Sequence, residues 1–270
     1  MDHHGLGAPD RLLLADLNYA ESNREFSRRS SGAAHDEDGL LLYAGGHPLP
    51  VLTNGAMRLD ARLSPSDAID RARAFFAARK RGFTWIVRTH ADADLEEVLV
   101  AAGVPLFGEP PGMVIDERIA DAASPAGISL RLVTTPAEVA DFAAVSGEAY
   151  ATYGMPEGVA PAIFARPDAL IAPHIRAYVA YEGATPLGAA MMLLSHGVGG
   201  VYWVGTRPCA RGRGLAELCT RAATNAGFDL GARFVTLQAS VMGEPIYKRM
   251  GYVEVTRYRS YVEFHPPNAR

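Results

Sequence analysis

The chain has 270 residues, 49% of them hydrophobic, and a formal net charge of −4. This length suffices for one or two domains with packed cores, and the nearly balanced charge gives no reason to expect a nucleic-acid or membrane partner. Two cysteines, Cys209 and Cys219, are too few for a disulfide framework, and no Cys/His cluster has metal-ligand spacing. Without a signal-peptide pattern or a long apolar run, we expect a cytoplasmic protein that needs no metal.

Hydrophobic periodicity predicts alternating helices and strands in the first half. Leucines at helical spacing indicate a helix over 10–29, and Ser64 followed by Pro65 is typical of the start of a second helix. A third helix is expected over 95–102, where Gly103 stops it. Short apolar or β-rich runs predict strands at 40–43, 51–59, 83–87 and 113–115.

Residues 116–127 are rich in Ala, Asp, Ser, Pro and Gly, a composition typical of a domain boundary. We therefore expect two domains, over residues 1–120 and 121–270.

The second half combines both kinds of element. Thr135-Pro136 is expected to cap a helix that runs to about Tyr150, and further helices are predicted from the end of the 206–213 loop to 230 and over 245–250. Predicted strands lie at 128–133, 177–181, 187–194, 200–204, 234–237 and 258–264. Strands that first pair antiparallel and then alternate with helices predict a mixed α+β fold, with a largely antiparallel sheet flanked by helices.

The most specific feature is the segment Thr206-Arg-Pro-Cys-Ala-Arg-Gly-Arg-Gly-Leu-Ala216, between a predicted strand and a predicted helix. Its glycines allow the backbone to turn tightly and to approach a ligand closely. Free N–H groups at a helix N-terminus attract anions. A diphosphate would fit there, although a Gly-rich turn with solvated arginines has the same pattern. An ATPase P-loop is excluded because no Gly-Lys-Ser/Thr follows, and Glu217 stands where a dinucleotide fingerprint needs a small residue.

At these residues the chain resembles the GNAT superfamily of N-acetyltransferases. The coenzyme motif of that family, Gln/Arg-x-x-Gly-x-Gly/Ala, matches Arg211 to Ala216 in full. A second family motif, a tyrosine followed shortly by a Gly-aromatic pair, matches Tyr247 and Gly251-Tyr252. The resemblance covers residues 128–264.

The resemblance implies acetyl-CoA as co-substrate and a role for particular residues. Tyr247 corresponds to the tyrosine that often protonates the leaving thiolate. Ser240 stands where many relatives have an asparagine that contacts the coenzyme, so the serine is a departure from the pattern. The remaining expected coenzyme contacts are the backbones of Val204, Gly205 and Thr206 for pantetheine, and of Arg211, Gly212, Arg213, Gly214, Leu215 and Ala216 for the pyrophosphate.

The general base that deprotonates the acceptor amine cannot be assigned from the sequence. Glu148, Tyr150, Tyr153 and His196 are candidates, each with a surface or core-edge role as the alternative. Tyr202, two residues before Val204, would share its face in a strand and so is a candidate substrate contact, with core packing as the alternative.

The first half resembles a shortened copy of the second, so the chain is expected to be a tandem acetyltransferase. Residues 58–64, where a coenzyme loop would lie, contain no glycine. We therefore expect only the second copy to bind coenzyme; an unrelated N-terminal α/β domain is the alternative.

The expected activity is transfer of an acetyl group from acetyl-CoA to a primary amine, on a small molecule or a protein, by direct attack on the thioester. A catalytically silent coenzyme-A-binding regulator and a transferase of longer acyl groups remain alternatives. The chain could be a monomer or a homodimer.

Overall fold

Residues 7–265 are described by the computed structural model, and most helices and strands lie where the sequence predicts them. The first half contains, in chain order, α1 (Ala8–Arg29), β1 (Ala33–Glu37), β2 (Leu40–Ala44), β3 (Asn54–Arg58), α2 (Pro65–Ala77), β4 (Phe83–Arg88), α3 (Ala93–Ala101), β5 (Leu106–Gly108) and β6 (Pro111–Ile115). The second half contains β7 (Ile128–Leu132), α4 (Pro136–Ala151), α5 (Val159–Ile163), β8 (Ile175–Glu182), β9 (Thr185–Ser195), β10 (Val198–Thr206), α6 (Leu215–Asp229), β11 (Val235–Gln238), α7 (Glu244–Arg249) and β12 (Val253–Glu263).

Capping hydrogen bonds confirm the predicted starts of α4 and α2. Thr135 Oγ1 accepts a hydrogen bond from the Glu138 N–H at 3.3 Å, while the Glu138 carboxylate accepts from the Thr135 N–H at 3.0 Å. This reciprocal capping box satisfies two N–H groups that the helix itself cannot. Ser64 caps α2 in the simpler way, by accepting from the Asp67 N–H at 3.2 Å.

The strands form one mixed sheet. Their order is β1-β2-β3-β4-β12-β6-β11-β10-β9-β8-β7, and β5 pairs with β12. Two neighbouring pairs are parallel, β3 with β4 and β10 with β11. In each parallel pair a single helix connects the strands, α2 in the first half and α6 in the second. The sheet is otherwise antiparallel, so the predicted mixed α+β class is confirmed.

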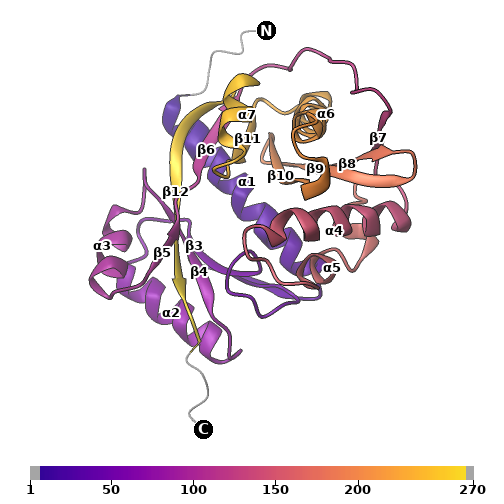
Figure 1. The fold of residues 1–270 in the computed structure, drawn as a ribbon. Coiled ribbons are helices and arrows are strands. Elements are labelled where there is room, and N and C mark those ends of the chain that lie inside the picture. The colour runs from indigo at the N-terminus through magenta and orange to yellow at the C-terminus, as the bar shows by residue number, and fades with distance from the viewer. Residues whose placement is uncertain (1–6, 266–270) are drawn as a thin grey trace.

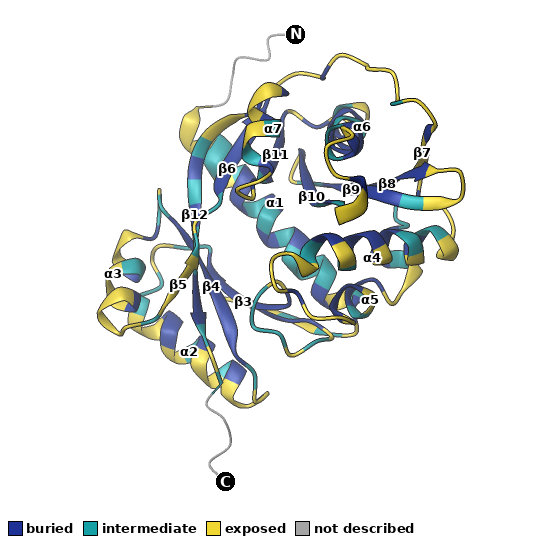
Figure 2. Ribbon diagram, in the orientation of Figure 1, coloured by how far each residue is buried: buried dark blue, intermediate teal, exposed yellow. Residues whose placement is uncertain are grey.

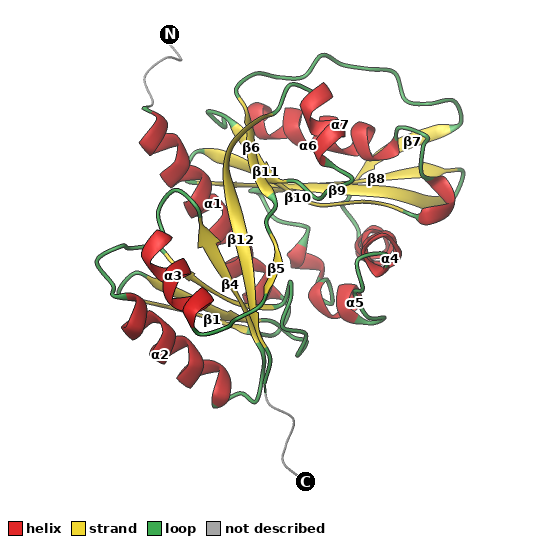
Figure 3. Ribbon diagram, turned by 60° about the vertical axis from the view of Figure 1, so that its left-hand side comes forward, coloured by secondary structure: helices red, strands yellow, loops and turns green. Residues whose placement is uncertain are grey.

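The two halves exchange their last strands. β6 belongs to the first half but pairs with β11 of the second, through Val235↔Ile115 to Gln238↔Gly112. β12 begins beside β6 and then continues into the first half, where it pairs with β4 from Tyr258↔Arg88 to Glu263↔Phe83. Figures 1 and 3 show β12 running along both halves. Hydrogen bonds therefore cross the boundary that the linker composition indicated.

Helices cover the sheet and close its hydrophobic cores. α6 packs with Leu215, Leu218 and Cys219 on one face of the second half, and α4 packs with Phe142 and Val145 on the other. α2 and α3 cover the first half. Figure 2 shows these helices with buried residues toward the sheet and exposed residues outward, as their amphipathic patterns predict.

Candidate functional site

β10 and β11 separate in the middle of the second half. They pair only from Gly199↔Val235 to Val201↔Leu237. Beyond Val201, the pairing of β10 with β9 shifts register between Tyr202 and Gly205, and Trp203 has a left-handed φ of 55°. This β-bulge leaves the end of β10 without a β11 partner, so its backbone N–H and C=O groups on that side are available to a ligand.

The loop after β10 forms an uncapped helix N-terminus. Gly212 and Gly214 have φ values of 76° and 77°, a conformation that costs other residues about 1–2 kcal/mol. Gly214 is the N-cap of α6 and supplies no capping side chain. The first helical bond runs from the Leu218 N–H to the Gly214 carbonyl, so the preceding N–H groups have no partner inside the helix and favour an anion.

A cavity of about 430 Å³ lies between this loop, the end of β10 and α7. Ten of the predicted site residues line it: Val204, Gly205, Thr206, Arg211, Gly212, Gly214, Leu215, Ala216, Ser240 and Tyr247. The structure thus brings together side chains and backbone from two motifs that are far apart in the sequence. Two candidates for the general base, Tyr150 and Tyr153, also line the cavity. The sequence did not indicate its remaining lining residues, which are Ala149, Ala210, Glu217, Met242, Gly243, Ile246 and Arg249.

Tyr247 lies buried in the cavity wall, with 6% of its surface exposed. Burial raises its pKa above the usual value, so the phenol stays protonated at physiological pH and can donate a hydrogen bond. Gly243 leaves room for the ring, because a Cβ at that position would lie 2.7 Å from Tyr247 Cε2. The spacing of four residues between them, one helical turn, is a signal for this contact that the family motif alone does not carry.

Thr206, at the end of β10, provides a polar atom suited to a ligand. Its Oγ1 is buried and has no hydrogen-bond partner among residues 7–265. A buried hydroxyl without a partner is costly, which a polar ligand in the cavity would relieve. Together with the free N–H groups at the start of α6, this atom fits the polar amide arm and the pyrophosphate of a coenzyme A molecule.

Three predicted residues lie outside the cavity lining. Arg213 is exposed and forms an ion pair with Glu182 on β8. Glu148, also exposed, lies 3.4 Å from Arg207. Tyr202 is buried and its hydroxyl donates to Asn18 of α1.

The bulge explains the position of Tyr202. Tyr202 and Trp203 both pack in the core that contains α4, whereas Val204 packs against the core beneath α6. Side chains therefore do not alternate strictly between the two faces at this point of β10. The prediction that Tyr202 and Val204 share a face is wrong. A single extra residue in a strand reverses the faces that follow it.

The structure places some candidates for the general base at the cavity and others away from it. Tyr150 and Tyr153 line the cavity. Burial raises the pKa of Tyr150 well above its usual range, as does the nearby Tyr247. His196 lies in the turn between β9 and β10, at the opposite end of β10 from the coenzyme loop.

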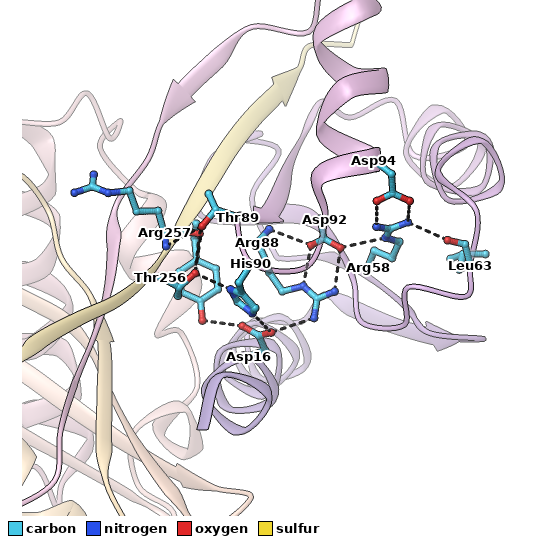
Figure 4. Close-up of polar contacts among 11 residues, drawn as sticks. Asp16, Arg58, Leu63, Arg88, Thr89, His90, Asp92, Asp94, Thr256 and Arg257 are labelled. Carbon is cyan, nitrogen blue, oxygen red and sulfur yellow. Dashed lines mark hydrogen bonds and ion pairs between the residues drawn. The ribbon is translucent and has the colours of Figure 1, made fainter. Parts of the chain in front are cut away.

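The equivalent place in the first half is filled by its own side chains (Figure 4). β3 and β4 also pair only briefly, at Gly55↔Thr84 and Ala56↔Trp85. Beyond this pairing the fully buried Arg58 donates from Nε to Asp92 Oδ1 at 3.1 Å and forms a two-pronged ion pair with Asp94. An arginine and the start of α3 thus occupy the gap that stays open in the second half.

The ionic network continues from Asp92 to α1. Arg88 donates from Nε to Asp92 Oδ2 at 2.8 Å and from Nη1 to Asp16 Oδ2 at 3.0 Å. Asp16 also accepts from Tyr258 Oη at 2.8 Å and lies 3.0 Å from His90 Nε2. These contacts join α1, β4 and the exchanged strand β12 in one buried network.

Within residues 7–265, no group of three or more His, Cys, Asp or Glu side chains is arranged to hold a metal ion. None of the helices in that range combines the length and the apolar character needed to cross a bilayer.

No protein-family model matches the chain, and no match is found among curated proteins. Solved structures are similar over nearly its whole length. A GCN5-related N-acetyltransferase from Kribbella flavida superimposes with a TM-score of 0.70 and 22% identity, over 94% of this chain and 96% of that one. For one from Sphaerobacter thermophilus the TM-score is 0.61 at 16% identity, over 86% of this chain and 78% of that one.

A tandem GNAT protein from the clavulanic acid biosynthesis pathway covers both halves. Its TM-score is 0.56 and its identity 15%, over 97% of this chain and 98% of that one. At such low identities the likeness concerns the fold, and the fold is the one that the coenzyme motif predicts. The chain therefore has the fold of the tandem GNAT acetyltransferases.

Proposed function

We propose that this protein transfers an acetyl group from acetyl-CoA to a primary amine. The observation that carries the proposal is the cavity between the separated ends of β10 and β11. One of its walls contains the uncapped N-terminus of α6, and another contains the buried, protonated Tyr247. Anion binding and proton donation are thereby available in one space, as acyl transfer from a coenzyme A thioester requires.

Each part of the cavity has a distinct task in this proposal. The N–H groups around Gly212 and Gly214 bind the pyrophosphate, and the exposed Arg211 beside them adds positive charge. The unpaired backbone and the hydroxyl of Thr206 bind the amide arm. Acetyl-CoA supplies an activated acyl group, and Tyr247 donates its proton, or a hydrogen bond, to the departing sulfur.

We further propose that only the second half binds coenzyme. In the first half Arg58, Asp92 and Asp94 fill the gap between the strands. The helix that follows, α2, has its N-terminus capped by Ser64, whereas Gly214 leaves that of α6 free. The first half therefore provides neither the space nor the free N–H groups that a second coenzyme would need.

Isothermal titration with acetyl-CoA and with ATP tests the proposal, using Gly214→Glu and a matched control, Gly231→Glu. Both glycines have left-handed φ values, 77° and 86°, and a Cβ at either would meet nothing within 4 Å. They lie at opposite ends of α6, so the two variants add the same strain and charge. We expect acetyl-CoA, and not ATP, to bind wild type and Gly231→Glu at about one site per chain, and Gly214→Glu to lose at least about 10-fold in affinity. Unchanged affinity in Gly214→Glu would refute the coenzyme assignment.

A further inference from the structure

Asn18 of α1, in the first half, is bonded to the strands of the second. The side chain is wholly buried. Its Nδ2 lies 2.8 Å from the Val198 carbonyl, 3.2 Å from the Leu193 carbonyl and 3.0 Å from Ser195 Oγ. A buried amide with this many partners specifies one position for α1 against β9 and β10.

The same amide fixes Tyr202, the residue at which the β10 bulge begins. Tyr202 Oη donates to Asn18 Oδ1 at 2.6 Å. Both groups lie directly over Gly200, where a Cβ would come within 1.9 Å of Asn18 Oδ1 and 2.5 Å of Tyr202 Oη. Only glycine leaves space for this contact, so the sequence of β10 is fitted to the helix of the other half.

Aromatic contacts from α1 hold both residues of the bulge. Tyr19 stacks on Tyr202 with ring centroids 6.4 Å apart, and Phe26 meets Trp203 edge-on at 6.1 Å. Trp203 is the residue with the left-handed φ. For a bulky side chain that conformation persists only where its surroundings impose it. α1 supplies part of those surroundings.

We propose that Asn18 and Tyr202 are positioning residues for the acyl end of the coenzyme; this inference rests on the proposed function. β10 leads into the pyrophosphate loop, and Trp203 precedes Thr206 by three residues, or about 10 Å of strand. The bulge therefore adjoins the part of the cavity farthest from the pyrophosphate, where the thioester lies. Through Asn18, the first half sets the direction of the backbone groups at that end.

Tyr202→Phe tests the inference, because it removes one hydroxyl and keeps the ring. Isothermal titration compares coenzyme A, which lacks an acyl group, with acetyl-CoA. We expect Kd for acetyl-CoA to rise about fivefold, as for the loss of one hydrogen bond between the backbone at the bulge and the acyl group, while Kd for coenzyme A changes less than about twofold. Asn23→Ala is the control, since within residues 7–265 the Asn23 side chain bonds only to the Tyr19 carbonyl of its own helix. Ser195→Ala, which removes one partner of Asn18, should shift the same ratio by a smaller factor.

A spectroscopic readout reports on the bulge directly. The chain has two tryptophans, so in a Trp85→Phe background the emission comes from Trp203 alone. We expect Tyr202→Phe to shift that emission and Asn23→Ala to leave it unchanged. Equal weakening of both ligands, or no change in the ratio of their Kd values, would overturn the positioning role. Failure of the wild-type chain to bind either ligand would instead refute the proposed function.

Discussion

Tyr153 Oη donates a hydrogen bond to Ser240 Oγ at 3.2 Å, across the cavity that both residues line. Tyr153 follows α4 and Ser240 precedes α7, so the bond joins two walls that are separate in the sequence. Ser240 Oγ accepts a second bond, from the Gly243 N–H at 3.1 Å. Its own proton remains available to the coenzyme, although the asparagine frequent in relatives would offer two donors.

Ser240→Ala is therefore expected to weaken acetyl-CoA binding by about 3- to 10-fold, the value of one hydrogen bond. Isothermal titration gives the dissociation constants of acetyl-CoA for the wild type and for Ser240→Ala. Ser129→Ala, an exposed serine on β7 far along the sheet, is the control and should leave the affinity unchanged. An unaltered dissociation constant in Ser240→Ala would show that this hydroxyl does not contact the coenzyme.

Tyr247→Phe is expected to lower kcat by about 100-fold while the Kd of acetyl-CoA changes little, because general acid catalysis is lost and the shape of the cavity is kept. The assay follows free coenzyme A with an amine that the wild-type chain acetylates. Tyr252→Phe is the matched control: this buried tyrosine bonds to Thr224 Oγ1 at 2.7 Å and does not line the cavity.

The pH profile of the wild-type enzyme gives an independent check on Tyr247. Burial raises the pKa of this phenol, and the protonated form is the one that donates. Raising the pKa extends that form to higher pH, so Tyr247 should cause no loss of kcat up to about pH 10, the ordinary tyrosine value. A decline in kcat between pH 8 and about 10 that disappears in Tyr247→Phe would contradict the raised pKa of Tyr247.

Local chemistry made much of the second half predictable. The capping residues Thr135 and Glu138 mark the start of α4 by hydrogen bonds within four residues. Gly212 and Gly214 indicate left-handed backbone whatever surrounds them, and both have it. The loop, the helix after it and the fold followed from such short-range signals.

Long-range pairing was not predictable in the same way. The sequence indicates that 113–115 and 258–264 are strands, but no local pattern says that each pairs with the other half. The sequence does not predict β1 and β5. Ala33–Glu37 is mostly exposed and has no apolar run, and Leu106–Gly108 is only 3 residues long. Trp203, in the bulge, packs against Phe26, Tyr150 and Phe164, which are distant in the sequence, so no local pattern in β10 predicts its conformation.

The two acidic partners of Arg58 should differ sharply in their contribution to stability. Asp92 is wholly buried, whereas the side chain of Asp94 is 55% exposed. Asp92→Ala removes one of the two counter-charges of each buried cation, Arg58 and Arg88, and should lower the free energy of unfolding by about 3–5 kcal/mol. Asp94→Ala should cost about 1 kcal/mol or less, because solvent already screens that pair. Urea unfolding of both variants measures the difference, and similar losses would contradict the prediction that burial decides how much each partner of Arg58 contributes to stability.

The two cysteines should react at very different rates. Cys219 lies fully buried in α6, and burial raises its pKa to about 12; Cys209 is exposed in the turn before the coenzyme loop. Since the thiolate is the reactive form, a raised pKa keeps Cys219 protonated and inert through neutral and mildly alkaline pH. Ellman's reagent should therefore modify about one thiol per native chain and both after unfolding in guanidinium. Cys209→Ser should abolish the fast phase, and a fast phase that survives this change would mean that α6 opens readily in solution.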